Sequence, residues 1–255
     1  MIRRIKNYSN GNKPHPRLNV IIFSIVLFSY FLPFDTFSQG LITRSNDLRI
    51  GDFYYSDGTT SHVQNDNKEC IGIVFSLNTS QEEKRLGFTH GYIVAMNDCD
   101  GGTQVNWGKN IDLPDPHKNI DYVEDFIYDK NGYIYNFMGK FDRSNPAYIL
   151  AKNYEVSLPL NKTSGWYLPS VGQWYDILSN LGELQLQNHF YFNGSKIKQS
   201  LQRKGLNISG NSYLTSTERD KSMTWIVDFG ENPGGFYSPW NSKKTKHRVR
   251  AVAAF

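Results

Sequence analysis

The hydrophobic pattern changes its period along the chain, from strand-like to helical and back again. Strand-like apolar runs occupy 71–75 and 92–96, helical spacing follows in 146–154 and 170–181, and strict alternation returns in 223–229. The order is therefore strands, helices and strands, without the regular alternation that builds a parallel sheet. We predict an α+β fold with a mostly antiparallel sheet and two to three helices.

The expected helices carry start signals. Asn145 precedes Pro146, a capping residue type followed by the residue favoured at the first helical position. Ser170 and Gln173 have the spacing of a capping box and open the apolar stripe that runs to 181. A third, more polar helix is expected over 195–204.

Residues 1–38 have the organisation of a Sec-type signal peptide. Basic side chains precede an apolar run over 20–34, about 15 residues long and shorter than a membrane-spanning helix of about 20. Thr36 and Ser38 provide small residues for cleavage before Gln39. We expect export to the periplasm, the cell surface or the medium, with no stable membrane span after cleavage. An uncleaved signal anchor is the alternative.

After this leader we expect an entry segment, 39–60, and one domain, 61–255. The leader also carries the net positive charge of the chain. Of 28 basic and 24 acidic residues, five and one lie in the leader, so the remaining chain has 23 of each. A formally neutral chain lacks the general positive charge that binds nucleic acid, so we expect no nucleic-acid partner.

Two cysteines flank the first predicted hairpin. Cys70 leads into the strand-like run 71–75, and Cys99 follows the run 92–96. If these strands pair antiparallel across the polar loop 78–85, the two thiols meet at the open end of the hairpin. Because export permits disulfides, we predict a Cys70–Cys99 bridge, with two free thiols as the alternative.

Three short motifs in a fixed order resemble the Lcl C-terminal-domain family, which is named for a collagen-like bacterial adhesin. They are Gly-Trp-Tyr-Leu-Pro-Ser at 165–170, Tyr-Leu-Thr-Ser-Thr-Glu at 213–218 and Arg-Val-Arg-Ala-Val at 248–252. With 51–56 and 71–75, the resemblance covers roughly residues 50–255. It implies a C-type-lectin-like fold, similar to that of formylglycine-generating enzymes, in a secreted single-domain bacterial protein. It also implies adhesion or glycan binding.

The chain departs from this family pattern at two places. Leu214 and Thr215 stand where common members have Trp and Ser, and no second Arg precedes the final Phe255. These changes leave the implied fold intact. They remove a Trp and an Arg that a ligand could contact.

We expect most side chains of these motifs to be structural. The apolar ones are predicted to be core. Glu218 and Arg250 are predicted to pair, because a charge near the core is tolerated only with a partner, and ligand contact is the alternative. The residues assigned this role are Trp166, Leu168, Pro169, Trp174, Ser216, Thr217, Glu218, Trp225 and Arg250.

Two groups near the C-terminal end of the sequence are candidate ligand contacts. The basic run 243–248 suits a polyanionic glycan held by charge, with a solvated hairpin as the alternative. Aromatic residues in the preceding Gly- and Pro-rich loop suit a sugar held by stacking. The candidates are Tyr237, Trp240, Lys243, Lys244, Lys246 and Arg248.

We expect no metal site, no cofactor and no catalytic centre. Carboxylates cluster at 98–102, but the further ligands of a calcium loop are missing, so a turn is favoured. The histidines are scattered without metal-ligand spacing. The sequence has no nucleophile elbow, phosphate loop or zinc signature. The formylglycine-generating enzymes use a cysteine pair near the C-terminal end of the domain. In this chain both cysteines lie in the first quarter of the domain.

We therefore predict an exported, non-catalytic recognition protein that binds a glycan or a surface protein in adhesion. The alternative is a structural or tip subunit of a pilus-like surface assembly, and an enzyme of the formylglycine-generating type is a third, less favoured reading. A glycan binder should show exposed aromatic rings beside polar side chains. A structural subunit should show a long unpaired edge strand or a detachable arm.

Overall fold

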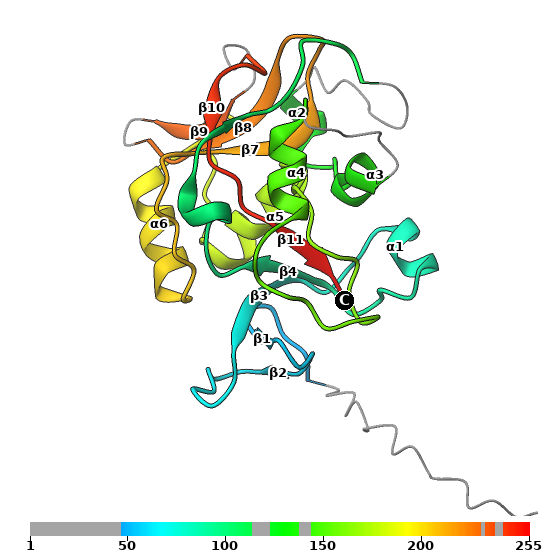
Figure 1. The fold of residues 1–255 in the computed structure, drawn as a ribbon. Helices are drawn as coiled ribbons and strands as arrows, with labels where there is room; N and C mark the ends of the chain where they lie inside the picture. Colours follow the sequence, from blue (N-terminus) through cyan, green and yellow to red (C-terminus); the bar gives the residue numbers. More distant parts are fainter. Residues whose placement is uncertain (1–46, 114–122, 138–143, 231–232, 238–241) are drawn as a thin grey trace, which may run out of the picture. The chain divides into compact units, whose positions relative to one another are not determined.

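The computed structural model describes residues 47–113, 123–137, 144–230, 233–237 and 242–255, which belong to one compact unit, Ile42–Phe255 (Figure 1). The strands are β1 (Phe53–Tyr55), β2 (Thr60–Ser61), β3 (Cys70–Ser76), β4 (Tyr92–Ala95), β5 (Val105–Asn106), β6 (Tyr191–Phe192), β7 (Ser212–Glu218), β8 (Thr224–Asp228), β9 (Gly234–Tyr237), β10 (Lys246–His247) and β11 (Val252–Ala254). The helices are α1 (Gln81–Arg85), α2 (Val123–Phe126), α3 (Gly132–Phe137), α4 (Pro146–Lys152), α5 (Val171–Leu181) and α6 (Gly194–Arg203), with a 3-10 turn η1 (Cys99–Gly102).

A five-stranded antiparallel sheet in the order β11-β4-β3-β1-β2 forms the centre of the fold. The predicted β3–β4 hairpin is confirmed, with Ile73 opposite Val94, and β11 pairs along the other side of β4, with Val252 also opposite Val94. The outer side of β11 is bonded in turn to Tyr167 through two backbone hydrogen bonds of 2.9 and 3.0 Å. Strands distant in the sequence thus meet in the middle of the molecule.

A second sheet has the order β6-β9-β8-β7, and β5 pairs with β10 in a third. All the ladders between named strands in the described part of the chain are antiparallel. The predicted α+β class with mostly antiparallel sheets is therefore confirmed. The finer prediction of a C-type-lectin-like fold stays a prediction.

Two apolar clusters cover opposite faces of the five-stranded sheet. The first joins Ile73 and Val94 of the sheet to Trp174 of α5 and Trp225 of β8. The second joins the other face to α4 and to Trp166. Because helices cover both faces, the strands are buried on both sides and read as continuous apolar runs. The predicted core residues Trp166, Leu168, Pro169, Trp174 and Trp225 are all buried, as expected.

Helix α5 forms where its sequence predicts it. The Ser170 hydroxyl accepts a hydrogen bond from the Gln173 amide at 3.3 Å, and the Gln173 side chain accepts one from the Ser170 amide at 3.0 Å. This capping box satisfies two donors that the first helical turn leaves unpaired. Trp174 and Leu178, one turn apart on the same face, are fully buried.

The prediction of two to three helices is too low, because the described residues also contain three shorter ones. Helix α1 lies in the hairpin loop that the sequence suggested was irregular, and α2 and α3 precede α4. Each has four to six residues. A helix this short spans too few turns to display an apolar stripe, so its residues carry no periodic signal.

The predicted Cys70–Cys99 disulfide is wrong: both cysteines are free. The Cys70 thiol is 3.6 Å from the carbonyl oxygen of Gly72 and 3.7 Å from the sulfur of Met96, which packs on the first cluster. Cys99 belongs to the second cluster and is fully buried. The hairpin does bring the two segments together, but the Cys70 thiol contacts Met96 at the first cluster, whereas Cys99 is packed into the second.

We expect thiol labelling to reflect this separation. In unreduced, denatured protein both cysteines should react. In the folded protein Cys99 should react far more slowly than Cys70, because burial removes access and raises the pKa of its thiol to about 12. Mass spectrometry after timed alkylation measures both. A protein that takes up no label when denatured would contain the disulfide after all.

Candidate functional site

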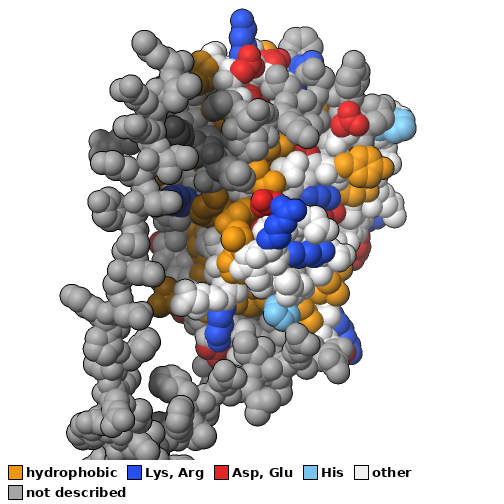
Figure 2. Space-filling view, turned by 90° about the vertical axis from the view of Figure 1, so that its right-hand side faces the viewer, with side chains coloured by type: hydrophobic (Ala, Val, Ile, Leu, Met, Phe, Trp, Pro, Cys, Tyr) orange, Lys and Arg blue, Asp and Glu red, His pale blue; other side chains and the backbone are white. Residues whose placement is uncertain are grey.

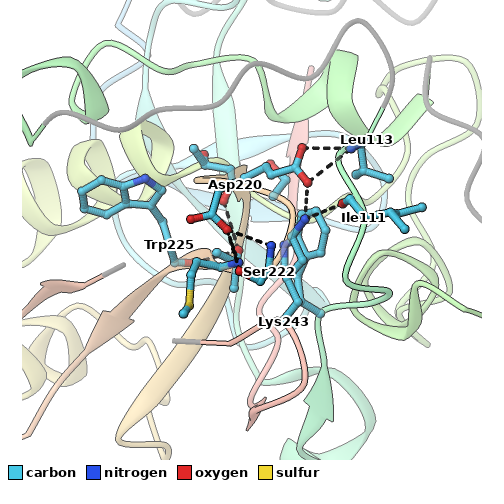
Figure 3. Close-up of polar contacts among 12 residues, drawn as sticks. Ile111, Leu113, Asp220, Ser222, Trp225 and Lys243 are labelled. Carbon is cyan, nitrogen blue, oxygen red and sulfur yellow. Dashed lines mark hydrogen bonds and ion pairs between the residues drawn. The ribbon is translucent and has the colours of Figure 1, made fainter. Parts of the chain in front are cut away.

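The motif residue Glu218 lies at the end of β7 in a buried polar centre. Its carboxylate pairs with Lys243 and accepts hydrogen bonds from the Leu113 amide at 3.1 and 3.3 Å. The Lys243 ammonium also donates to the Ile111 carbonyl oxygen at 2.7 Å and lies 4.6 Å from the centre of the Trp107 ring. These contacts converge from three separate segments of the chain (Figure 3).

The Glu218–Lys243 pair is closed to solvent. The Glu218 side chain is 1% exposed and that of Lys243 is 0% exposed. Burial raises the pKa of Glu218 and lowers that of Lys243, while the attraction between the two groups opposes both shifts. A surface ligand cannot reach either charge without opening the fold. The pair therefore fastens β7 to the segments at 111–113 and 243.

The predicted Glu218–Arg250 pair is wrong, because Arg250 has a different partner. Its guanidinium pairs with Asp98 and donates to the Ala95 carbonyl oxygen at 2.8 Å. The same carboxylate accepts hydrogen bonds from Arg248 at 3.1 Å and from the Tyr213 hydroxyl at 3.0 Å. The expectation that each charge is partnered is confirmed, although the partners differ. Asp98 serves this network, at the place where the sequence suggested a turn.

The other two residues of the 216–218 motif are also structural. Thr217 donates to the carboxylate of Asp129 at 2.5 Å and accepts from the Val171 amide at 2.9 Å, which ties β7 to the start of α5. Burial raises the pKa of Asp129. Ser216 donates its backbone amide to the Pro169 carbonyl oxygen at 2.8 Å. The motif therefore connects β7 to three neighbours in three consecutive residues.

The predicted ligand contacts separate into three groups. Lys243 is buried, which removes it as a surface contact. Lys244 and Lys246 are exposed, and Arg248 is partly exposed beside Asp98. Tyr237 is partly exposed on β9, and Trp240 lies outside the described residues. The basic run is thus split by the fold, and only part of its charge faces solvent.

Surface charge is mixed on the face shown in Figure 2. Lys and Arg side chains occur there beside Asp and Glu side chains and small hydrophobic areas. Among the residues that the structure describes, no cluster of His, Cys, Asp and Glu side chains has the size of a metal site. The helices within those same residues are all too short or too polar to cross a membrane.

Sequence reasoning missed a histidine held between two carboxylates. The Nδ1 atom of His62 is 2.6 Å from Asp52 and its Nε2 atom is 2.9 Å from Asp47. Both ring nitrogens face acceptors, an arrangement that only the protonated imidazole satisfies fully. The hydrogen bonds to Asp52 and then to Asp47 raise the pKa of His62, with Arg49 opposing. This contact joins the first described residues to the segment after β2.

We expect this contact to weaken as the pH rises. Since the pKa of His62 is raised on folding, its contribution is fully present below its unfolded value of about 6.5 and is lost as the pH passes through the folded value. Hydrogen exchange of the 47–52 amides should then accelerate beyond the intrinsic pH effect. NMR titration of His62 in the native protein and in Asp47→Asn checks this. Equal His62 pKa values in the two proteins would contradict the assignment.

No family model matches the sequence, and no curated protein matches it either, so membership of the Lcl C-terminal-domain family stays a prediction. The fold is similar to a crystal structure of a fimbrial protein from Bacteroides ovatus ATCC 8483, with a TM-score of 0.51 and 18% identity. The match covers 82% of this chain and 49% of the fimbrial protein, so the chain spans about half the length of that relative.

Proposed function

We propose that this protein is a subunit of a fimbria-like assembly on the cell surface. The observation that carries the proposal is the fold shared with a fimbrial protein over most of this chain. The signal-like leader supports it, because a surface subunit has to be exported. The closed charge networks of Glu218 and Asp98 also suit a module that holds its shape outside the cell.

The edges of the sheets bear on how such a subunit joins its neighbours. The outer side of β11 is occupied by Tyr167, and β7 is bonded on its outer side to the Pro169 and Arg248 backbones. The opposite edge of the five-stranded sheet, β2, has two residues. The long unpaired edge strand that we expected of a structural subunit is therefore not found among the described residues.

Electron microscopy with gold-labelled antibodies tests the proposal. Cells that produce the protein and a deletion strain are compared, and appendages sheared from both are probed for the protein. We expect gold on fibres of the producing cells and co-sedimentation of the protein with the sheared fibres. Label along the fibre would indicate a shaft subunit and label at the end a tip subunit. Protein found only as free monomer would overturn the proposal.

A further inference from the structure

One face of the β6-β9-β8-β7 sheet carries a row of side chains that has no role in the proposed fimbria-like assembly. Tyr191, Gly235, Asp228 and Ser212 lie opposite one another on the four strands in register. Directly opposed residues project to the same face of a sheet. In the next row of this face, Ile226 and Leu214 are buried in the second cluster. The face thus passes from core to surface within two residues.

Tyr191, at one end of this row, forms an aromatic platform with Tyr237, which lies opposite Ile226 in the next row and packs against the second cluster. Their ring centres are 5.7 Å apart, and both side chains are partly exposed. A β-carbon at Gly235 would come within 2.8 Å of the Phe190 carbonyl oxygen and within 3.2 Å of the Tyr237 ring. Its hydroxyl donates to the Pro233 carbonyl oxygen at 2.8 Å. The glycine and this hydrogen bond together hold the ring in place, so little side-chain entropy remains to be lost on binding.

Polar groups continue the row beyond the rings. Asp228 accepts the Gly230 amide at 2.7 Å with one carboxylate oxygen, and its other oxygen has no hydrogen-bond partner among the described residues. Ser212 bonds to the Nδ1 atom of His247 at 2.7 Å. His247 is 7% exposed, and its Nε2 atom is buried without a hydrogen-bond partner in the described part of the chain, so a surface ligand cannot reach it.

We propose that this row is a binding site for a neutral glycan, with Tyr191 and Tyr237 as the stacking surface and the Asp228 carboxylate as the hydrogen-bond partner for sugar hydroxyls. A pyranose ring has an apolar face of C–H groups, which packs on aromatic rings, and an edge of hydroxyls, which needs fixed polar groups. The Asp228 carboxylate disfavours sulfated or phosphorylated sugars by repulsion. The site is independent of the proposed assembly, since a free monomer would carry it as well.

The test uses affinity electrophoresis of the exported protein through gels that contain xyloglucan, galactomannan or mannan. The variants are Tyr191→Ala, Tyr237→Ala and Asp228→Asn, and Tyr191→Phe tests retention of stacking. The matched control is Tyr128→Ala, because Tyr128 is 76% exposed and lies outside the row. Heparin is run as a polyanionic probe, with Lys244→Ala/Lys246→Ala. Circular dichroism verifies that each variant is folded.

We expect at least one neutral polysaccharide to retard the native protein at both low and high salt. Tyr191→Ala and Tyr237→Ala should weaken this binding by at least about fivefold, the loss typical of an aromatic anchor, while Tyr128→Ala and Tyr191→Phe retain it. Asp228→Asn should weaken it although the fold is intact. Absence of binding to all three polysaccharides, or binding unchanged in folded Tyr191→Ala, would overturn the proposal. Binding to heparin alone that falls with salt and requires the lysines would overturn it too.

Discussion

Replacing Lys243 with methionine should lower the free energy of unfolding by about 3–5 kcal/mol at pH 7, the usual cost of removing one partner from a buried ion pair. The substitution leaves the Glu218 carboxylate buried with its charge unpaired, and it removes the ammonium from the face of the Trp107 ring. Urea unfolding followed by tryptophan fluorescence measures the change. Per atom removed, this loss should exceed the loss expected for Trp166→Ala, because methionine preserves most of the volume of the lysine side chain.

The pH dependence separates charge from packing in this variant. Without Lys243 the folded pKa of Glu218 rises further, so the lost stability should return as the pH falls and the carboxyl becomes protonated. The double variant Lys243→Met/Glu218→Gln is the matched control. It removes both charges, keeps an acceptor for the Leu113 amide and should regain most of the loss at pH 7. If Lys243→Met unfolds like the native protein at pH 7, the pair is exposed in solution.

Replacing Trp166 with alanine should cost about 3–5 kcal/mol, the range for a buried aromatic side chain. The Trp166 ring is 4% exposed and packs edge-on against Tyr154 at 5.3 Å. Its indole nitrogen donates to the Val156 carbonyl oxygen at 2.7 Å, so the variant also leaves that acceptor unpaired. Thermal unfolding followed by circular dichroism reports the loss.

Two further substitutions calibrate the Trp166 result. Trp166→Phe keeps a ring in the cavity but loses the hydrogen bond, and it should fall between the native protein and Trp166→Ala. Leu160→Ala removes an apolar side chain that is 89% exposed and should change stability by less than about 0.5 kcal/mol. A melting temperature of Trp166→Ala equal to that of the native protein would show that the ring is accessible, which would make it a ligand contact.

The elements that the sequence predicted are those with local signals. Helix α5 is marked by its capping box and by a stripe that extends over three turns, and the β3–β4 hairpin is marked by two apolar runs of strand length. The short helix α1 also has a capping box, between Ser80 and Glu83, which a search for that spacing alone would have found. Its apolar stripe is missing because five residues make little more than one turn.

Local sequence patterns could not predict contacts between residues that are distant in the sequence. Lys243, Lys244 and Lys246 have the same charge and similar neighbours in the sequence, yet Lys243 alone among them is buried. Nothing in the run distinguishes it, because its burial depends on Glu218 and Trp107 from distant segments. The disulfide prediction is wrong for a related reason: the proximity of two chain segments does not specify the direction in which each side chain points.

The residues of the proposed glycan site could have been found by combining several sequence signals. The Gly- and Pro-rich composition of its loop makes Tyr237 a candidate ligand contact, whereas Tyr191 and Asp228 belong to no motif. Gly235 is the informative residue, because a glycine in a strand often marks a close approach of other groups, here the Phe190 carbonyl oxygen and the Tyr237 ring. Pairing β6, β8 and β9 in register would then have placed Tyr191 and Asp228 beside it.

The position of β11 implies that one step in the folding of this chain occurs late. The strand closes one side of β4 and bridges it to Tyr167, but its residues follow every other described element in synthesis. Until it docks, the edge of β4 is an open template on which a neighbouring chain could pair. Folding of so non-local a sheet is slow. The interval before closure is therefore when we expect this protein to be most prone to aggregate.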